Sequence, residues 1–288
     1  MAGHEFATSP LPSFGLSVDY DLAWPLDNAG QAALRALLYA NGILVFRGQS
    51  LSDADQERIM GYFGSILGEE GENRELATDG NLGSCLLLFH SDLGFTPEPF
   101  KLLSLYGLDV DEGRTSTRFS SGTHVLRTLP ADLNNRLAGL TATTVIPPTQ
   151  TERAVRYDTP AFLPQISQPA IIPHPVTGEP ILFLSEMQTS RLDQLPPEES
   201  EALLQELFTC LYADANVYEH VWHNGDLVIW DNIALTHGRR DQAGIAKRRL
   251  RRIAVADKTF FQLCPQFRPD DPKVIAWGAG EILEAADF

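Results

Sequence analysis

The chain has 288 residues, of which 43% are hydrophobic and 21% charged, and its formal net charge is −16 at pH 7. This composition is typical of a globular protein with a full core, in one large domain or two small ones. The acidic balance argues against a nucleic-acid partner, which would need a basic face. Three widely spaced cysteines suggest a reducing compartment, and neither a leader sequence nor an apolar run of 18 residues is present. We therefore expect a soluble, cytoplasmic protein without membrane association.

The N-terminal part predicts two helices on either side of a short buried strand. Leucines recur on one face of a helix over residues 28–41, which Gly42 can end. Residues 43–46 form an apolar strand, and Ser52 can cap the second helix. The glycine-rich, acidic segment 69–83 has no period, so we expect a long loop that serves as a lid or a binding loop.

The middle of the chain alternates short apolar runs with turn signals. Three strands and two short helices are expected, at residues 85–89, 101–108, 115–121, 123–128 and 131–137.

A second long irregular segment is expected at residues 147–169, which hold five of the nineteen prolines and no apolar period. Residues 171–184 then predict a hairpin. An amphipathic helix with Pro197 at its start covers residues 197–212. Many short strands with helices confined to the N-terminus and two inserts indicate a mainly β protein with helical decoration, a sandwich or jelly roll in one domain.

The stretch from residue 221 to residue 255 carries the densest signals. A His-Asn-Gly-Asp turn leads into an apolar strand at residues 227–230, which ends at two turn formers, Asp231 and Asn232. Four arginines follow between Arg248 and Arg252. In an acidic protein they favour an anionic ligand, because guanidinium groups bind carboxylates through two bonds. A surface strand with solvated charges is the alternative.

His90, Asp92 and His237 have the residue types and spacing of a metal site. His90 and Asp92 are two apart at the end of a predicted strand, so in an extended chain both side chains leave the same face. His237 follows another buried strand and can supply a third ligand. Two histidines and a carboxylate leave one face of an octahedral ion open, as in non-haem Fe(II) oxygenases. Zinc hydrolases can use the same ligand types, usually in a tetrahedral site with one open position.

The arginines favour the oxygenase. An Fe(II) oxygenase needs two extra electrons, and their commonest donor, 2-oxoglutarate, chelates iron at one end and needs a buried guanidinium at the other. Arg248 and Arg252 lie eleven and fifteen residues after His237. We expect a hairpin to return their strand beside the iron, with Arg249 on the opposite face. A hydrolase has no such need.

From about residue 42 to residue 255, the chain resembles the taurine dioxygenase / 2,4-dichlorophenoxyacetate dioxygenase family of Fe(II)/2-oxoglutarate-dependent enzymes. The similarity rests on four motifs: Gly-Ile-Leu-Val-Phe-Arg-Gly from Gly42, the His90-x-Asp92 pair, Gly-Asp-Leu-Val-Ile-Trp-Asp-Asn before His237, and His-Pro-x-Thr-Gly from His174. It implies a double-stranded β-helix, or cupin-like jelly roll, in a single domain over residues 1–288, with segments 69–83 and 147–169 as lids or inserts.

The resemblance also implies a role for six residues: Fe(II) ligation by His90, Asp92 and His237, binding of the distal carboxylate of 2-oxoglutarate by Arg248 and Thr117, and contact with an acid group of the substrate by Arg252. Two positions depart from the family pattern. Arg-Thr-Ser precedes Thr117 in place of the usual Gly-Gly-Asp, and Ile233 replaces an arginine-like residue.

The implied reaction uses O₂ and 2-oxoglutarate, releases succinate and CO₂, and oxidises a C–H bond of a small, anionic organic substrate, with hydroxylation as the default. Desaturation and oxidative cyclisation use the same cofactors and remain open. A zinc-type hydrolase and a non-catalytic jelly-roll binding module are the more distant alternatives. Relatives often form dimers or tetramers, so a homo-oligomer is an open alternative to a monomer.

Overall fold

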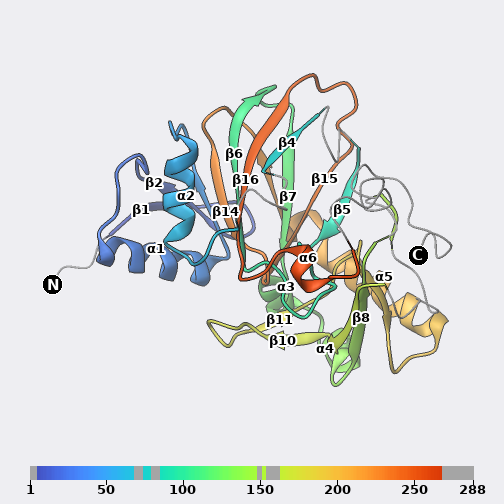
Figure 1. Cartoon of the computed structure of the whole chain (residues 1–288). Helices are drawn as coiled ribbons and strands as arrows, with labels where there is room; N and C mark the ends of the chain where they lie inside the picture. Colours follow the sequence, from blue (N-terminus) through green and yellow to red (C-terminus); the bar gives the residue numbers. More distant parts are fainter. Residues whose placement is uncertain (1–4, 68–73, 79–84, 148–150, 154–162, 268–288) are drawn as a thin grey trace.

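The computed structural model describes residues 5–67, 74–78, 85–147, 151–153 and 163–267. Their main feature is a pair of facing β-sheets, with helices on the outer face of one sheet and at one end of the pair (Figure 1). No helix in these ranges is long and apolar enough to cross a bilayer.

The larger sheet has seven strands, which pair antiparallel except for β2 and β3. In spatial order they are β1 (Ala7–Pro10), β2 (Leu16–Asp19), β3 (Ile43–Phe46), β14 (Leu227–Asp231), β6 (Leu102–Val110), β16 (Arg248–Val255) and β4 (Glu75–Ala77). The smaller sheet has the order β13 (Val217–Val221), β7 (Ser116–Ser121), β15 (Leu235–Arg239) and β5 (Leu87–His90). From β5 to β7 and again from β13 to β16, successive strands alternate between the sheets. This confirms the predicted jelly roll.

A hydrophobic cluster fills the space between the two sheets. Leu103, Val228 and Leu250 of the larger sheet pack with Phe119 and Leu235 of the smaller sheet. Full burial of a side chain of this size contributes about 1.5–3 kcal/mol, so the cluster fixes how the sheets face each other. It thereby fixes which side chains point into the barrel.

Two helices cover the outer face of the larger sheet, α1 (Asn28–Asn41) and α2 (Asp53–Gly61). Helix α1 ends as predicted at Gly42, whose φ of 78° is in the left-handed region and whose N–H bonds Leu38. Ser52 caps α2 as predicted, in a capping box with Asp55.

The remaining elements form a layer at one end of the barrel. A three-stranded sheet and a two-stranded hairpin pack there with three helices around one apolar cluster. The elements are α3 (Gly122–Thr128), α4 (Ala131–Leu137), β8 (Thr141–Val145), β9 (Gln165–Pro169), β10 (Ile171–Pro173), β11 (Pro180–Leu182), β12 (Thr189–Leu192) and α5 (Pro197–Leu211). A 3₁₀ turn (Asp214–Asn216) and α6 (Phe260–Leu263) complete the described chain.

The expected hairpin between the strands of His237 and Arg248 is wrong, and parts of both predicted inserts are strands where only loops were expected. Segments 69–83 and 147–169 lie largely outside the described residues, but their described parts include β4, paired with β16, and β9, paired with β8. Both strands are at sheet edges, where the hydrogen-bond ladder holds a strand that has no apolar period. The expected hairpin is absent as well: β15 pairs with β5 and β7, whereas β16 pairs with β6 and β4 in the opposite sheet.

Candidate active site

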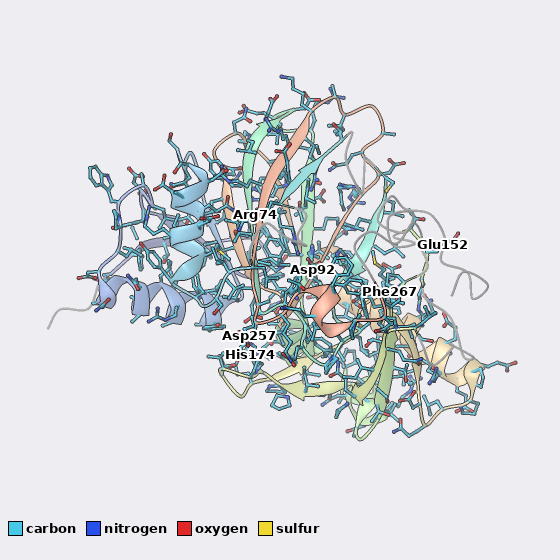
Figure 2. The ribbon with its side chains drawn as sticks, viewed as in Figure 1. Arg74, Asp92, Glu152, His174, Asp257 and Phe267 are labelled. Atoms are coloured by element: carbon cyan, nitrogen blue, oxygen red, sulfur yellow. The ribbon has the colours of Figure 1, made fainter. Side chains whose placement is uncertain are left out.

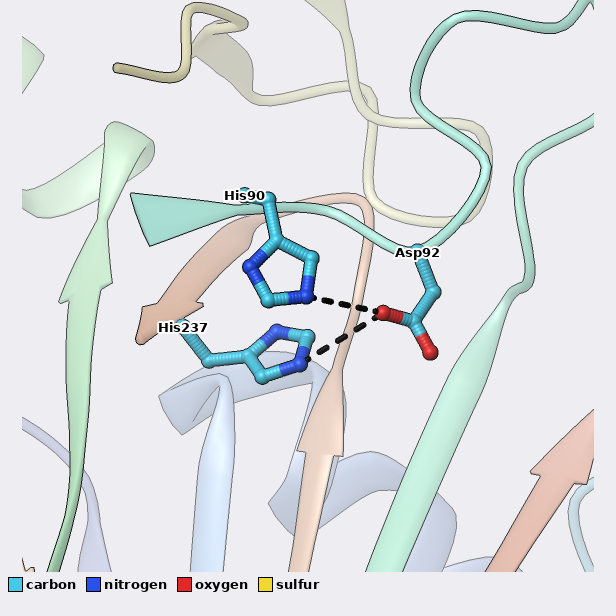
Figure 3. A group of neighbouring side chains, drawn as sticks. All are labelled: His90, Asp92 and His237. Carbon is cyan, nitrogen blue, oxygen red and sulfur yellow. Dashed lines mark ion pairs between the residues drawn. The ribbon is translucent and has the colours of Figure 1, made fainter. Parts of the chain in front are cut away.

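Strand pairing brings two histidines and a carboxylate together inside the barrel. His237 on β15 lies directly opposite His90 on β5, and the chain turns after β5 to present Asp92 (Figure 3). The Nε2 atoms of His90 and His237 lie 3.3 Å and 3.5 Å from the same oxygen, Asp92 Oδ1. In the part of the chain that the structure describes, no other group of three His, Cys, Asp or Glu side chains comes this close.

Both imidazoles are suited to bind a metal through Nε2. His90 Nδ1 lies 2.9 Å from the Leu88 carbonyl oxygen, which can only accept, so Nδ1 carries the proton and Nε2 keeps its lone pair. His237 packs against the rings of Phe119 and Trp230. Burial, together with the neighbouring His90, lowers the pKa of His237 to about 3, so the ring is neutral near pH 7. Neutral imidazole is the form that coordinates metal.

Asp92 is ionised and held by an arginine. Arg252 Nη2 donates to Asp92 Oδ2 at 2.5 Å, and its guanidinium lies over the Phe100 ring, 5.4 Å from the centroid. Burial opposes ionisation of Asp92, but Arg252 and the two imidazoles outweigh it and hold the pKa of this carboxyl well below its usual range. Two imidazoles and one carboxylate form a complete ligand set for a divalent ion.

Arg248 is a buried cation without a counter-ion. Its side chain is 4% exposed, and none of the residues described here gives it a carboxylate partner. Among the same described residues, its Nε finds no hydrogen-bond acceptor. Burial and the nearby Arg239 lower the pKa of Arg248 to about 9, which leaves the guanidinium charged near pH 7. An unpaired buried charge costs several kcal/mol, so this interior position is suited to an anion.

The arginines of β16 alternate between the two faces of the larger sheet. Arg248 and Arg252 are directed into the barrel, where Arg252 meets Asp92. Arg249 is exposed and bonds Glu75, which confirms that it points the other way.

Thr117 lies on the inward face of the smaller sheet. It is 3% exposed and two residues from Phe119, which pairs with His237 across β7 and β15. Its Oγ1 accepts a hydrogen bond from Trp222 Nε1 at 3.0 Å, so its own proton remains available to an acceptor.

Two further residues belong to this interior and were not predicted. Arg239, 3% exposed and two residues after His237, donates from Nη2 to the Cys85 carbonyl at 2.9 Å. Side chains alternate between the two faces of a strand, so the spacing of two residues from His237 could have indicated that Arg239 also points inward. Asn232 bonds the main chain of Asp92 across 140 residues of sequence, and no local pattern reveals such a contact.

The jelly roll holds two histidines of paired strands together with a carboxylate. This arrangement places the protein in the class of non-haem metal-dependent oxygenases. The sequence profile of the taurine catabolism dioxygenase TauD, TfdA family matches residues 7–254, and the chain belongs to this family. It is therefore an Fe(II)- and 2-oxoglutarate-dependent dioxygenase. The predictions of family, fold and enzyme class are confirmed.

Individual relatives match along most of the chain. The alpha-ketoglutarate-dependent 2,4-dichlorophenoxyacetate dioxygenase of Cupriavidus pinatubonensis is 27% identical over 279 residues, which cover 85% of this chain and 96% of the relative. An alkylsulfatase of Acinetobacter baylyi is 26% identical, covering 82% and 79% respectively. The crystal structure of AAD-2 in complex with Mn(II) and N-oxalylglycine superposes with a TM-score of 0.73 at 25% identity, over 88% of this chain and 98% of that one.

Proposed function

We propose that this enzyme hydroxylates a C–H bond of a small organic acid, with Fe(II) at His90, Asp92 and His237 and with the distal carboxylate of 2-oxoglutarate at Arg248 and Thr117. Substrate, O₂ and 2-oxoglutarate then give the hydroxylated substrate, succinate and CO₂. The observation that carries the proposal is Arg248, a charged guanidinium inside the barrel with no counter-ion among the described residues. A hydrolase would gain nothing from such a group, whereas a dicarboxylate cosubstrate needs it.

When bound, Fe(II) would activate O₂, the oxidant, and 2-oxoglutarate would supply two of the electrons that its reduction needs. The chain's own residues bind the metal and the cosubstrate, orient them, and exclude water. Arg252 holds the Asp92 carboxylate in place. The apolar rings of Phe119 and Trp230 support the His237 imidazole from within the core and keep solvent from that side.

We assign the acid group of the substrate to the neighbourhood of Arg252. Its guanidinium lies at the metal-site carboxylate, with one face against Phe100. A substrate anion that met this group would lie next to the metal. The names of two relatives, a 2,4-dichlorophenoxyacetate dioxygenase and an alkylsulfatase, support a substrate with a carboxylate or a sulfate group.

The test is O₂-dependent release of succinate from 2-oxoglutarate in the presence of Fe(II), with a panel of sulfonates, sulfate esters and aryloxy acids as substrates. Activity should disappear in His90→Ala. Succinate formed at the same rate without iron would contradict the scheme.

Anaerobic titration with Fe(II) and 2-oxoglutarate separates the alternatives. The oxygenase should show the weak visible charge-transfer band of the iron chelate. A zinc hydrolase or a binding module should show none.

A further inference from the structure

The turn between β14 and β15 carries a buried amide that grips the main chain of Asp92. Asn232 is fully buried, at 0% exposure, and its side chain makes three hydrogen bonds. The Asp92 N–H donates to Asn232 Oδ1 at 2.9 Å, and Asn232 Nδ2 donates to the carbonyls of Asp92 at 3.0 Å and Phe100 at 2.8 Å. One amide therefore meets both the donor and the acceptor of a single peptide residue.

Asp92 needs such support because it lies outside the hydrogen-bond ladder. Strand β5 ends at His90, and the next residue after Asp92, Leu93, has a φ of 58°. A left-handed conformation is uncommon for leucine and strains the main chain. This conformation of Leu93 persists when surrounding contacts fix it. The Asn232 amide provides such contacts at the adjacent residue, Asp92.

Asn232 is itself held firmly. Its N–H donates to the Lys101 carbonyl at 3.0 Å. The preceding Asp231 accepts the N–H groups of Ile233 and Ala234 through Oδ1, at 2.9 Å and 3.0 Å. Asp231 Oδ2 accepts from His174 Nε2 at 2.7 Å. The amide is thus presented from a turn that is tied to β6 and to the β10–β11 hairpin.

The same amide reaches the residue that supports Arg252. Phe100 receives the third hydrogen bond of Asn232, donates its own N–H to the Asp92 carbonyl at 3.3 Å, and places its ring under the Arg252 guanidinium. Arg252 in turn bonds Asp92 Oδ2. Asn232, Asp92, Phe100 and Arg252 therefore form a closed set of contacts around the carboxylate ligand.

We propose that Asn232 is a positioning residue that aims the Asp92 carboxylate at His90 and His237 and thereby sets the affinity of the metal site. The inference rests on the proposed role of Asp92 as a ligand. Asn232 touches neither metal nor substrate and acts only through the main chain of Asp92 and Phe100.

The experiment measures Mn(II) affinity by electron paramagnetic resonance in metal-free protein, without turnover. Asn232→Asp keeps one acceptor and loses both Nδ2 donors. It should weaken Mn(II) binding by about 10–100-fold, the usual effect of losing an outer-shell partner, and should change the line shape of bound Mn(II). Should this variant not fold by circular dichroism, Asn232→Ser, which keeps a hydroxyl acceptor, replaces it.

Asn224→Asp is the matched control. Asn224 lies before β14, at its opposite end from Asn232, and its Oδ1 likewise accepts a main-chain N–H, that of Val110, at 3.0 Å. The control should leave Mn(II) affinity and line shape unchanged.

A double-mutant cycle separates positioning from a merely structural role. In an Asp92→Ala background, Asn232→Asp should have no further effect on Mn(II) binding, because the carboxylate it aims is gone. An equal loss in both backgrounds would overturn the inference, and so would wild-type affinity in Asn232→Asp alone. If Asp92→Ala itself binds Mn(II) normally, the proposed ligand set fails; if only the Asn232 variants bind normally, that set stands and the positioning role alone fails.

Discussion

Among the described residues, the pair of His174 with Asp231 and the group of His90, His237 and Asp92 both combine histidine with aspartate, and they differ in how much of their hydrogen-bonding capacity is used. In the first group, His174 donates from Nε2 to Asp231 at 2.7 Å, and its Nδ1 accepts the N–H groups of Val176 and Thr177. In the second, the Nε2 atoms of His90 and His237 lie 3.3 Å and 3.5 Å from one oxygen of Asp92, and no described residue bonds His237 Nδ1. Figure 2 labels His174 and Asp92 in the same half of the molecule.

The difference shows which property distinguishes a metal site from a structural pair of the same residue types. The ring of His174 is saturated by protein groups, so the pair can only hold the turn and the hairpin together. The rings at the metal site keep lone pairs directed at a shared point. Both groups are built from histidine and aspartate, and unused bonding capacity separates the candidate metal ligands from the structural pair.

The sharpest test of this comparison is His237→Gln. Loss of an iron ligand should reduce turnover to below about a thousandth, because a metal supplies several kcal/mol to the rate-limiting step. The free energy of unfolding of the metal-free protein should stay within about 1 kcal/mol, since the ring has no protein hydrogen bond of normal length to lose. Succinate formation and urea unfolding measure the two effects. If His237→Gln lowered the free energy of unfolding as much as His174→Ala, described next, the two groups would no longer differ.

His174→Ala should show the reverse pattern. It leaves Asp231 buried without its partner, and we expect the free energy of unfolding to fall by about 3 kcal/mol, near the lower end for a broken buried pair. Urea denaturation followed by circular dichroism measures it. His223→Gln, at a half-exposed histidine, is the control and should change stability by less than about 0.5 kcal/mol. An unaltered midpoint in His174→Ala would show that the saturated pair is dispensable.

Arg248→Gln tests whether the buried guanidinium, which has no counter-ion among the described residues, binds the cosubstrate. It should raise the KM for 2-oxoglutarate about 30-fold, corresponding to about 2 kcal/mol for a truncated buried charge contact. The metal-free protein should not be destabilised, because no counter-ion is left behind. The neighbouring Arg249→Gln removes an exposed pair with Glu75 and should change KM less than twofold. Equal effects of the two substitutions would argue against a cosubstrate role for Arg248.

Thr117→Val should have the smallest effect. The substitution keeps the shape and removes the hydroxyl, so the KM for 2-oxoglutarate should rise about fivefold, near 1 kcal/mol for one hydrogen bond. Ser116→Ala, on the outward face of the same strand, should leave it unchanged. Initial rates at varied 2-oxoglutarate concentration measure both KM values, and a larger effect at Ser116 would refute the assignment.

The sequence was sufficient for much of the fold and for the residues of the metal group. Helix α1 was predicted with its bounds because a leucine stripe and a terminal glycine are local signals. His90 and Asp92 were found because their spacing suits a strand end. The four arginines of β16 drew attention because they are concentrated in an acidic chain, and the family resemblance singled out Arg248 among them.

What escaped prediction depends on tertiary contacts. Strands β4 and β9 are stabilised by ladders with distant partners and carry no apolar period. The hairpin between β15 and β16 was expected from proximity in sequence, but the chain crosses to the opposite sheet, which still brings Arg252 to Asp92. Asn232 was predicted only as a turn former, because a side chain that bonds a main chain 140 residues away leaves no periodic signature.

That long separation has a consequence for how the enzyme matures. During synthesis, His90 and Asp92 leave the ribosome well before His237, and closing so large a loop costs entropy before any contact rewards it. The metal pocket therefore forms only once β5 and β15 have paired. Fe(II) and cosubstrate then act on the finished barrel, where a ligand at one hundred times its Kd adds about 2.7 kcal/mol of stability. Iron supply in the cell should accordingly govern how long each newly made copy survives proteolysis.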